Sequence, residues 1–222
     1  MGKTAIILGA TGLTGSILLE KLIEDNRYET IKLFSRSKIE EIPPKVHQFI
    51  GDILELENYQ KDFIADDVFC CIGTTTKKTP DKTVYKQIDY GIPVKAAKLS
   101  KVNNINAFLV VSALGANAKS SIFYNKTKGE MERDVLAQNI PNTYILQPSI
   151  IGGNRNENRI GERIGLGVFK LFQPLLIGKL KKYRMIEAQT IAQAMLNLAN
   201  STPTKDNIIT SDHIKEISKK KN

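Results

Sequence analysis

Tyr124 and Lys128 form a pair that could transfer a proton. They stand four residues apart, so on a helix their side chains share one face, about one turn from each other. An ammonium group beside a phenol stabilises the phenolate, which makes the tyrosine a better proton donor and acceptor near neutral pH. Ser112 stands twelve residues before Tyr124, at the end of an apolar run, where its hydroxyl could bond a substrate carbonyl. These three residues are the candidate catalytic group.

The tyrosine–lysine spacing is weak evidence by itself, because Tyr28 and Lys32 repeat it. That copy crosses from a predicted helix into a predicted strand, where we expect no cleft. The pair at 124 and 128 follows a strand-end serine and lies on the helix after the fifth predicted strand. A coincidental pair on a helix surface is the alternative that the sequence leaves open.

A glycine-rich loop near the N-terminus predicts a dinucleotide site. The pattern G-x-x-G-x-x-G leaves an apolar strand and enters a helix, which is the context that such a motif requires. Its glycines permit a tight turn, close approach of backbone N–H groups to a pyrophosphate, and close packing of the helix on the strand. An ordinary glycine-rich turn is the alternative. The residues predicted to bind the cofactor here are Gly9, Thr11, Gly12, Leu13, Thr14 and Gly15.

The residues after the second predicted strand favour NADP(H) over NAD(H). An NAD site usually has an acidic side chain there, which holds the ribose 2′-hydroxyl. This sequence has Ser-Arg-Ser-Lys at 35–38, with no carboxylate. Arg36 could stack on adenine and bind a 2′-phosphate through its planar guanidinium, and a solvated surface arginine is the alternative.

Other strand ends supply further candidate contacts. Asp52 and Ile53 follow the third predicted strand and are expected beside the adenine, although Asp52 could instead cap a helix. Ile72, Gly73 and Thr74 end the fourth predicted strand, at the edge where open α/β sheets bind ligands.

These residues must be positioned by alternating strands and helices. Apolar runs predict strands at 4–8, 31–34, 46–50, 67–72, 107–111 and 143–146. Helical spacing predicts helices at 13–24, 81–99, about 121–137, 160–172 and 190–200, with a short one within 54–63. This alternation predicts an α/β fold, a doubly wound parallel sheet with helices on both faces. We expect one domain over residues 1–222, with a core of about 1–150 and a small C-terminal cap on the substrate cleft at 151–222.

The composition is that of an average globular protein. The chain has 222 residues, of which 41% are hydrophobic and 25% charged, and a formal net charge of +9. The excess positive charge favours an anionic ligand, but it is dispersed and no nucleic-acid recognition motif accompanies it, so we expect no nucleic-acid partner.

The few cysteines and histidines argue against a metal site. The two cysteines are adjacent, the two histidines are far apart, and a reducing cytoplasm is the expected location. The most apolar stretch, 164–177, has 14 residues and contains Lys170, so we expect no integral membrane segment.

Five segments resemble one branch of the atypical short-chain dehydrogenases, that of the HIV-Tat-interacting protein and its bacterial NAD(P)H-binding relatives. They are residues 68–76, 88–90, 110–116, 124–130 and 145–149. The resemblance spans nearly the whole chain and implies a Rossmann fold that binds NADP(H). It also implies that Lys128 holds the nicotinamide ribose beside Tyr124, and that the cofactor passes Pro148, Ser149 and Ile151.

Two positions depart from the family pattern. Asp89 stands where many short-chain dehydrogenases have a catalytic Asn, and Gln147 stands where relatives often have Arg before the proline. The expected function is NADP(H)-dependent hydride transfer to or from a carbonyl or alcohol of a small-molecule substrate. The alternative is a catalytically weak, NADP(H)-sensing regulatory protein with a protein partner, and a homodimer is compatible with both.

Overall fold

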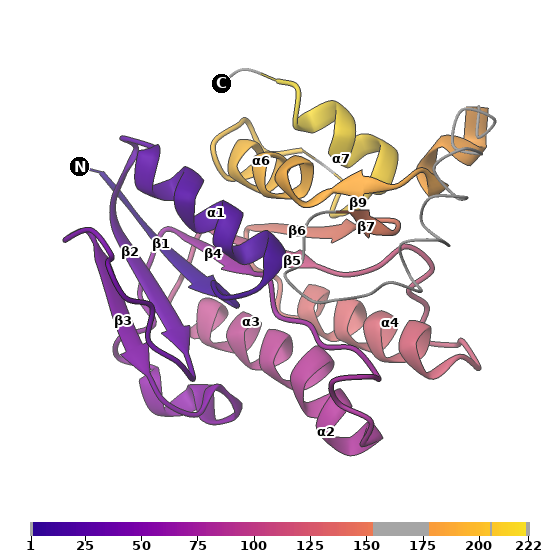
Figure 1. Cartoon of the computed structure of the whole chain (residues 1–222), viewed down its shortest axis with the longest axis horizontal. Coiled ribbons are helices and arrows are strands. Elements are labelled where there is room, and N and C mark those ends of the chain that lie inside the picture. The colour runs from indigo at the N-terminus through magenta and orange to yellow at the C-terminus, as the bar shows by residue number, and fades with distance from the viewer. Residues whose placement is uncertain (1, 153–177, 205, 221–222) are drawn as a thin grey trace.

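A seven-stranded parallel sheet forms the centre of the molecule (Figure 1). The structure is a computed structural model, which describes residues 2–152, 178–204 and 206–220. The strand order is β3-β2-β1-β4-β5-β6-β9, so the order reverses between β1 and β4, where open α/β sheets bind ligands. The strands are β1 (Lys3–Leu8), β2 (Tyr28–Ser35), β3 (Val46–Ile50), β4 (Asp67–Cys70), β5 (Ala107–Val111), β6 (Asn142–Gln147) and β9 (Ile208–Thr210).

Helices cover both faces of this sheet, as the sequence predicted. Figure 1 shows α1 (Leu13–Glu24), α6 (Ala188–Ala199) and α7 (Ser211–Ile217) on one face, and α3 (Ile92–Val102) and α4 (Phe123–Leu136) on the other. Strand residues alternate between these layers: Ile7 packs in the cluster with α1 and α6, and Leu8 in the cluster with α3 and α4. The expected doubly wound α/β fold is confirmed.

The C-terminal part contributes more to the sheet than the sequence indicated. Strand β9 pairs with β6 in parallel, although three residues were too short a run to predict a strand. Strands β7 (Ile151–Gly152) and β8 (Ile186–Glu187) form a separate parallel pair, and the 3-10 helix η4 (Gly178–Tyr183) precedes β8. The helix expected at 160–172 lies outside the described residues, and the cap at 151–222 stays a prediction.

The helix expected at 81–99 is interrupted by a π-turn. It consists of α2 (Lys82–Lys86), the π-helix η2 (Gln87–Gly91) and α3, and Asp81 caps its start by accepting hydrogen bonds from two backbone amides. Pro93 explains the interruption, because a proline has no N–H to donate and its ring crowds the carbonyl four residues earlier, that of Asp89. The wider turn leaves Asp89 buried on the side of the sheet's carboxyl edge.

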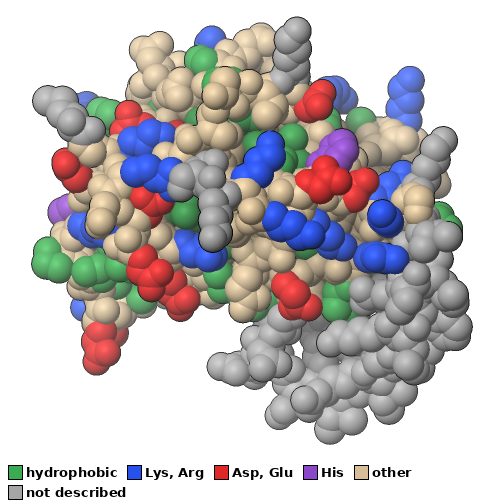
Figure 2. Space-filling model, turned by 90° about the horizontal axis from the view of Figure 1, so that it is seen from above, with side chains coloured by type: hydrophobic (Ala, Val, Ile, Leu, Met, Phe, Trp, Pro, Cys, Tyr) green, Lys and Arg blue, Asp and Glu red, His purple; other side chains and the backbone are tan. Residues whose placement is uncertain are grey.

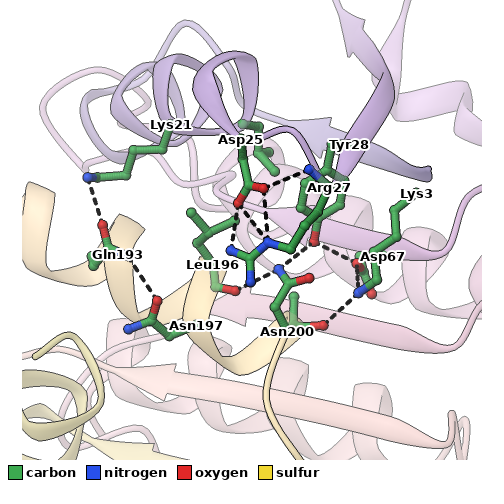
Figure 3. Close-up of polar contacts among 12 residues, drawn as sticks. Lys3, Lys21, Asp25, Arg27, Tyr28, Asp67, Gln193, Leu196, Asn197 and Asn200 are labelled. Carbon is green, nitrogen blue, oxygen red and sulfur yellow. Dashed lines mark hydrogen bonds and ion pairs between the residues drawn. The ribbon is translucent and has the colours of Figure 1, made fainter. Parts of the chain in front are cut away.

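A buried polar network holds the opposite, amino edge of the sheet together (Figure 3). Tyr28 donates a hydrogen bond to Asp67 Oδ2 at 2.7 Å, and Lys3 pairs with the same oxygen at 3.0 Å. Asn200, which follows α6, donates to the Tyr28 hydroxyl at 3.0 Å. Burial and the Asp67 carboxylate raise the pKa of Tyr28 far above its usual range. Tyr28 is therefore a structural residue, and it does not form a second catalytic pair with Lys32.

Removing this hydroxyl should destabilise the fold measurably. We expect Tyr28→Phe to lower the free energy of unfolding by about 1–3 kcal/mol, because the buried Asp67 loses a hydrogen-bond donor. Urea denaturation measures this loss. Tyr90→Phe is the matched control, since it removes a hydrogen bond to the partly exposed Asp134 and should cost less than about 1 kcal/mol. Equal unfolding free energies for the two variants would contradict the structural role of Tyr28.

In the part of the chain that the structure describes, no helix is long and apolar enough to cross a membrane. Figure 2 shows the face seen from above, where Lys and Arg side chains are interspersed with Asp and Glu. Among the described residues of this face, the positive charge is therefore not gathered into one basic patch.

Candidate functional site

Two adjoining cavities lie along the carboxyl edge of the sheet, where β1, β4, β5 and β6 end. The larger has a volume of about 1080 Å³ and the smaller about 760 Å³. They share Gly12 of the glycine loop and Ile72 to Thr74 after β4, so together they form one trough across the switch point. Its size and place suit an extended ligand, as expected for this type of sheet.

The glycine loop forms a backbone cradle at the middle of this trough. Gly9 has a φ of 84°, which favours glycine, and its carbonyl accepts a hydrogen bond from Gly12 N at 3.0 Å. A Cβ on Gly15 would lie 2.1 Å from the Gly9 oxygen, so only glycine lets α1 approach the loop. Gly12, the residue before α1, has no side chain with which to cap the helix, and the first helical residue, Leu13, lines the larger cavity. Uncapped amides at a helix start, facing a cavity, fit the two phosphates of a dinucleotide.

Most predicted loop residues line the trough, and one does not. Thr11 and Gly12 line both cavities, Gly9 lines the smaller one, and Leu13 and Thr14 line the larger one. Gly15 is buried behind the loop and lines neither, so its role in the structure is the close packing of α1.

The smaller cavity extends to the ends of β2 and β3. Arg36 lines it with an exposed side chain, and its guanidinium makes no hydrogen bond or ion pair with any residue in the described ranges. Ile53 and Asp52 line it as well. The Asp52 carboxylate accepts a hydrogen bond from Leu54 N at 2.8 Å and caps the 3-10 helix η1 (Ile53–Tyr59), so the capping alternative is present in the structure.

The tyrosine and lysine of the candidate pair lie at the start of α4 and line the larger cavity. The Lys128 ammonium is 2.8 Å from Asp89 Oδ1, and both side chains are at least 95% buried, with exposed fractions of 5% and 1%. The other Asp89 oxygen accepts a hydrogen bond from Thr74 N at 2.7 Å. Burial lowers the pKa of Lys128, but the attraction of Asp89 and Tyr124 outweighs it and the pKa is raised. The Asp89 carboxylate therefore stabilises the ammonium form of Lys128.

The tyrosine is less acidic than the sequence led us to expect. Burial raises the pKa of Tyr124, the Lys128 charge lowers it, and the Asp89 charge raises it again, so that it lies above its ordinary value. The predicted depression of this pKa by Lys128 is therefore wrong as a net effect. Desolvation is the largest cause of the raised pKa, and the negative charge of Asp89 adds to it by offsetting part of the field of the lysine.

Ser112 is bound to a carboxylate that the sequence did not single out. Its hydroxyl donates a hydrogen bond to Glu132 Oε1, and the amide of Gln147 donates to Oε1 and Oε2 of the same carboxylate at 2.9 and 3.0 Å. Glu132 stands four residues after Lys128, so helical spacing could have placed it on the same face. The contact also gives Gln147 a role, which the sequence left unexplained.

The remaining predicted residues all line the larger cavity: Ile72, Gly73, Thr74, Pro148, Ser149 and Ile151. The Ser149 hydroxyl donates to the Arg184 carbonyl, which ties the segment after β6 to the residues before β8. Lining residues that the sequence missed include Lys78, Leu114, Gly115, Lys182 and Tyr183. Lys78 lines both cavities.

Curated relatives match most of the chain. The protein HTATIP2 of Rattus norvegicus is 32% identical over 199 residues, covering 88% of this chain and 80% of the relative. "Protein FMP52-1, mitochondrial" of Scheffersomyces stipitis is 35% identical over 175 residues, covering 75% of this chain and 76% of the relative. No family model matches the chain.

Solved structures share the fold at low sequence identity. A UDP-glucose 4-epimerase of Thermotoga maritima, solved with UDP-glucose, has a TM-score of 0.68 at 15% identity and covers 97% of this chain and 81% of its own. The Bordetella bronchiseptica enzyme WbmH, in complex with NAD+, has a TM-score of 0.67 at 15% identity. The match covers 94% of this chain and 75% of the WbmH chain.

The relatives correct one expectation from the sequence. Several yeast relatives carry names that place them in mitochondria, which contradicts the cytoplasmic location inferred from cysteine usage. Cysteine usage of this kind does not separate the cytoplasm from the reducing interior of an organelle. The matches to HTATIP2 and FMP52 exceed 30% identity over more than two thirds of the chain. The chain therefore belongs to the NAD(P)-binding atypical short-chain dehydrogenases, in the branch of HTATIP2 and the FMP52 proteins.

Proposed function

We propose that the chain binds NADP(H) along the two cavities and is an oxidoreductase that interconverts a carbonyl and an alcohol. The observation that supports this most is the continuity of the trough. The uncapped glycine loop lies at its middle, Arg36 at one end, and Tyr124 with Lys128 at the other. One extended dinucleotide could therefore contact all of them.

The preference for NADP(H) rests on Arg36. Its guanidinium is unpaired within the described part of the chain and lies after β2, where an NAD site would have a carboxylate. A planar, permanently charged fork binds a 2′-phosphate well. The likeness to WbmH, which was solved with NAD+, supports a nicotinamide dinucleotide without choosing between the two forms.

The residues of the larger cavity would handle the proton of the reaction. The bound nicotinamide would supply or accept the hydride. Tyr124 would donate its proton to the oxygen of a carbonyl during reduction and take it back during oxidation. Lys128, held by Asp89, would keep the Tyr124 hydroxyl oriented and hold the ribose.

A second candidate function is a sensor of NADP(H) with little turnover. It is favoured by the pKa of Tyr124, which desolvation and the Asp89 charge keep above its ordinary value although Lys128 lowers it. A weakly acidic tyrosine is a poorer proton donor near neutral pH.

Thermal unfolding tests the cofactor preference. At 100 times its dissociation constant, a ligand that binds only the folded chain adds about 2.7 kcal/mol of stability. We expect NADPH to raise the unfolding temperature more than NADH at equal concentration, and Arg36→Ala to remove most of the difference. Lys38→Ala is the matched control, because Lys38 is exposed and pairs with Glu40 at the surface. Equal shifts of the unfolding temperature with NADPH and NADH in the wild type would contradict a preference for NADP(H) that depends on Arg36.

Turnover separates the enzyme from the sensor. NADPH consumption is measured with a panel of aldehydes and ketones, for the wild type and for Tyr124→Phe. An enzyme should lose at least about 100-fold of its rate in the variant, while NADPH binding persists. NADPH binding without turnover in the wild type would instead support the sensor.

A further inference from the structure

A lysine and a tyrosine from the C-terminal part of the chain line the larger cavity beside the candidate catalytic residues. Lys182 and Tyr183 are the last two residues of the 3-10 helix η4, and neither lines the smaller cavity, where Arg36 lies. Tyr124 and Lys128 likewise line only the larger cavity. Lys182 and Tyr183 therefore belong to the part of the trough where we expect the substrate, and not to the end at Arg36.

Hydrogen bonds to one backbone carbonyl fix the turn that carries these two residues. The Arg184 carbonyl accepts from the Ser149 hydroxyl after β6 and, at 3.0 Å, from Lys215 Nζ of α7. The Arg184 amide donates to the Lys181 carbonyl at 3.1 Å and closes the turn between them. The backbone at Lys182 is thus held against two other segments of the fold.

The Lys182 ammonium has no carboxylate partner in the part of the chain that the structure describes. Its Nζ lies 5.3 Å from the centre of the Tyr183 ring, a cation–π contact that uses no hydrogen-bond acceptor. Asp89 is the one acidic residue among the described residues that line the larger cavity, and Lys128 pairs with it. The half-buried Lys182 therefore offers a molecule in this cavity a positive charge that no lining carboxylate neutralises.

The proposed cofactor leaves both this charge and part of the cavity to a second molecule. Its 2′-phosphate is assigned to Arg36, and its pyrophosphate to the glycine loop, where the two cavities join at Thr11 and Gly12. The larger cavity alone has a volume of about 1080 Å³, at the upper end of the range of roughly 300–1000 Å³ that is usual for small-molecule sites. It therefore has room for a substrate beside the nicotinamide half of the dinucleotide.

We propose that Lys182 binds a carboxylate of the substrate, so that the substrate is an oxo acid or the corresponding hydroxy acid. The inference rests on the proposed function, because it assigns the charge of the molecule that this function would convert. An ammonium group binds a carboxylate through charge-assisted hydrogen bonds. One lysine balances the single charge of a carboxylate, whereas a phosphate monoester carries nearly two charges at neutral pH. The ring of Tyr183, which is 46% exposed, offers an apolar surface to the body of the same molecule.

Binding of matched acids and amides tests this assignment. The probes are 3-acetylbenzoate and 4-acetylbenzoate, each compared with the acetylbenzamide of nearly the same shape and no charge. Dissociation constants are measured by ligand-observed NMR at about pH 7.5 with saturating NADP+, which cannot reduce a ketone. We expect at least one of the two acids to bind about tenfold more tightly than its amide, because its hydrogen bond to the ammonium joins two opposite charges.

Three variants of one turn assign the preference to Lys182. Lys182→Met should make the acid and its amide bind with dissociation constants within about threefold of each other. Lys182→Arg keeps the positive charge and should retain most of the preference. Lys181→Met is the matched control, since Lys181 is exposed and lines neither cavity, and it should leave the preference unchanged. The affinity for NADPH should stay within about threefold of the wild type in Lys182→Met.

A titration without cofactor tests the same contact separately. The full chain is labelled with ¹³C-lysine, and the ε-carbon signal of Lys182 is assigned by its loss in Lys182→Met. This signal should shift when the preferred acetylbenzoate is added and stay in place when its amide is added.

The results distinguish a failure of this inference from a failure of the proposed function. Equal binding of acids and amides by the wild type, no binding of any probe, or the same preference in Lys182→Met overturns the inference. Loss of NADPH binding in Lys182→Met with the preference for the acid retained also overturns it, because the lysine then binds the cofactor. A wild type that does not bind NADPH contradicts the proposed function instead, and the ε-carbon signal of Lys182 still decides whether the lysine binds a carboxylate.

Discussion

Lys128→Met is expected to lower the free energy of unfolding by about 3–5 kcal/mol, because it leaves the buried Asp89 charge without its partner. The same change removes the ammonium group that we propose orients Tyr124 and holds the ribose, so we expect turnover to be lost as well. Urea denaturation followed by circular dichroism measures the stability. The double variant Lys128→Met with Asp89→Asn should recover much of the loss, since no unpaired charge is then buried.

An exposed ion pair provides the matched control for this substitution. Lys86 pairs with Glu130 at 2.7 Å with nearly half of its side chain exposed, so Lys86→Met should cost less than about 1 kcal/mol. Two results would show that Lys128 does not stabilise the fold by pairing with the buried Asp89 charge. One is an equal loss of unfolding free energy in Lys128→Met and Lys86→Met, and the other is a double variant less stable than Lys128→Met.

Gly15→Ala is expected to reduce NADPH affinity by at least 100-fold. The new Cβ would lie 2.1 Å from the Gly9 carbonyl oxygen, which is a backbone atom and cannot move without displacing the loop. The start of α1 would shift, and its amides would no longer face the phosphates. Calorimetric titration with NADPH measures the affinity, and urea denaturation should show a cost of about 1–3 kcal/mol for the overpacking.

Gly91→Ala is the control for a glycine substitution away from the trough. The nearest atom to its Cβ would be 3.9 Å away, an ordinary contact distance. NADPH affinity should therefore be unchanged in this variant. An affinity within threefold of the wild type in Gly15→Ala would show that the loop does not hold the cofactor.

The regular elements of the fold could be predicted because their signals are local. The bounds of α1, β3 and β5 agree with the predicted ones, since each is an apolar pattern closed by polar residues or glycine. Strand β9 could not be predicted, because three residues adopt that conformation only when β6 offers them a partner. The π-turn was missed because one residue, Pro93, changes the geometry of a pattern that is otherwise helical.

In the candidate site, too, the parts that depend on local signals could be predicted and those that depend on distant contacts could not. The glycine loop and the Tyr124–Lys128 pair depend on residues close in sequence, and the structure brings them to one trough. The partners that alter their chemistry come from elsewhere in the chain. Asp89 meets Lys128 across 39 residues, and Glu132 meets Ser112 across 20. Such contacts depend on the register of strands and helices, which short motifs do not specify.

The most direct test of the account is to follow the backbone amides of the uniformly ¹⁵N-labelled chain while NADPH is added. If the glycine loop and the start of α1 bind the two phosphates, the amide signals of Gly12, Leu13 and Thr14 should shift most and saturate together. Shifts concentrated elsewhere, with these three amides unchanged at saturating NADPH, would contradict the account.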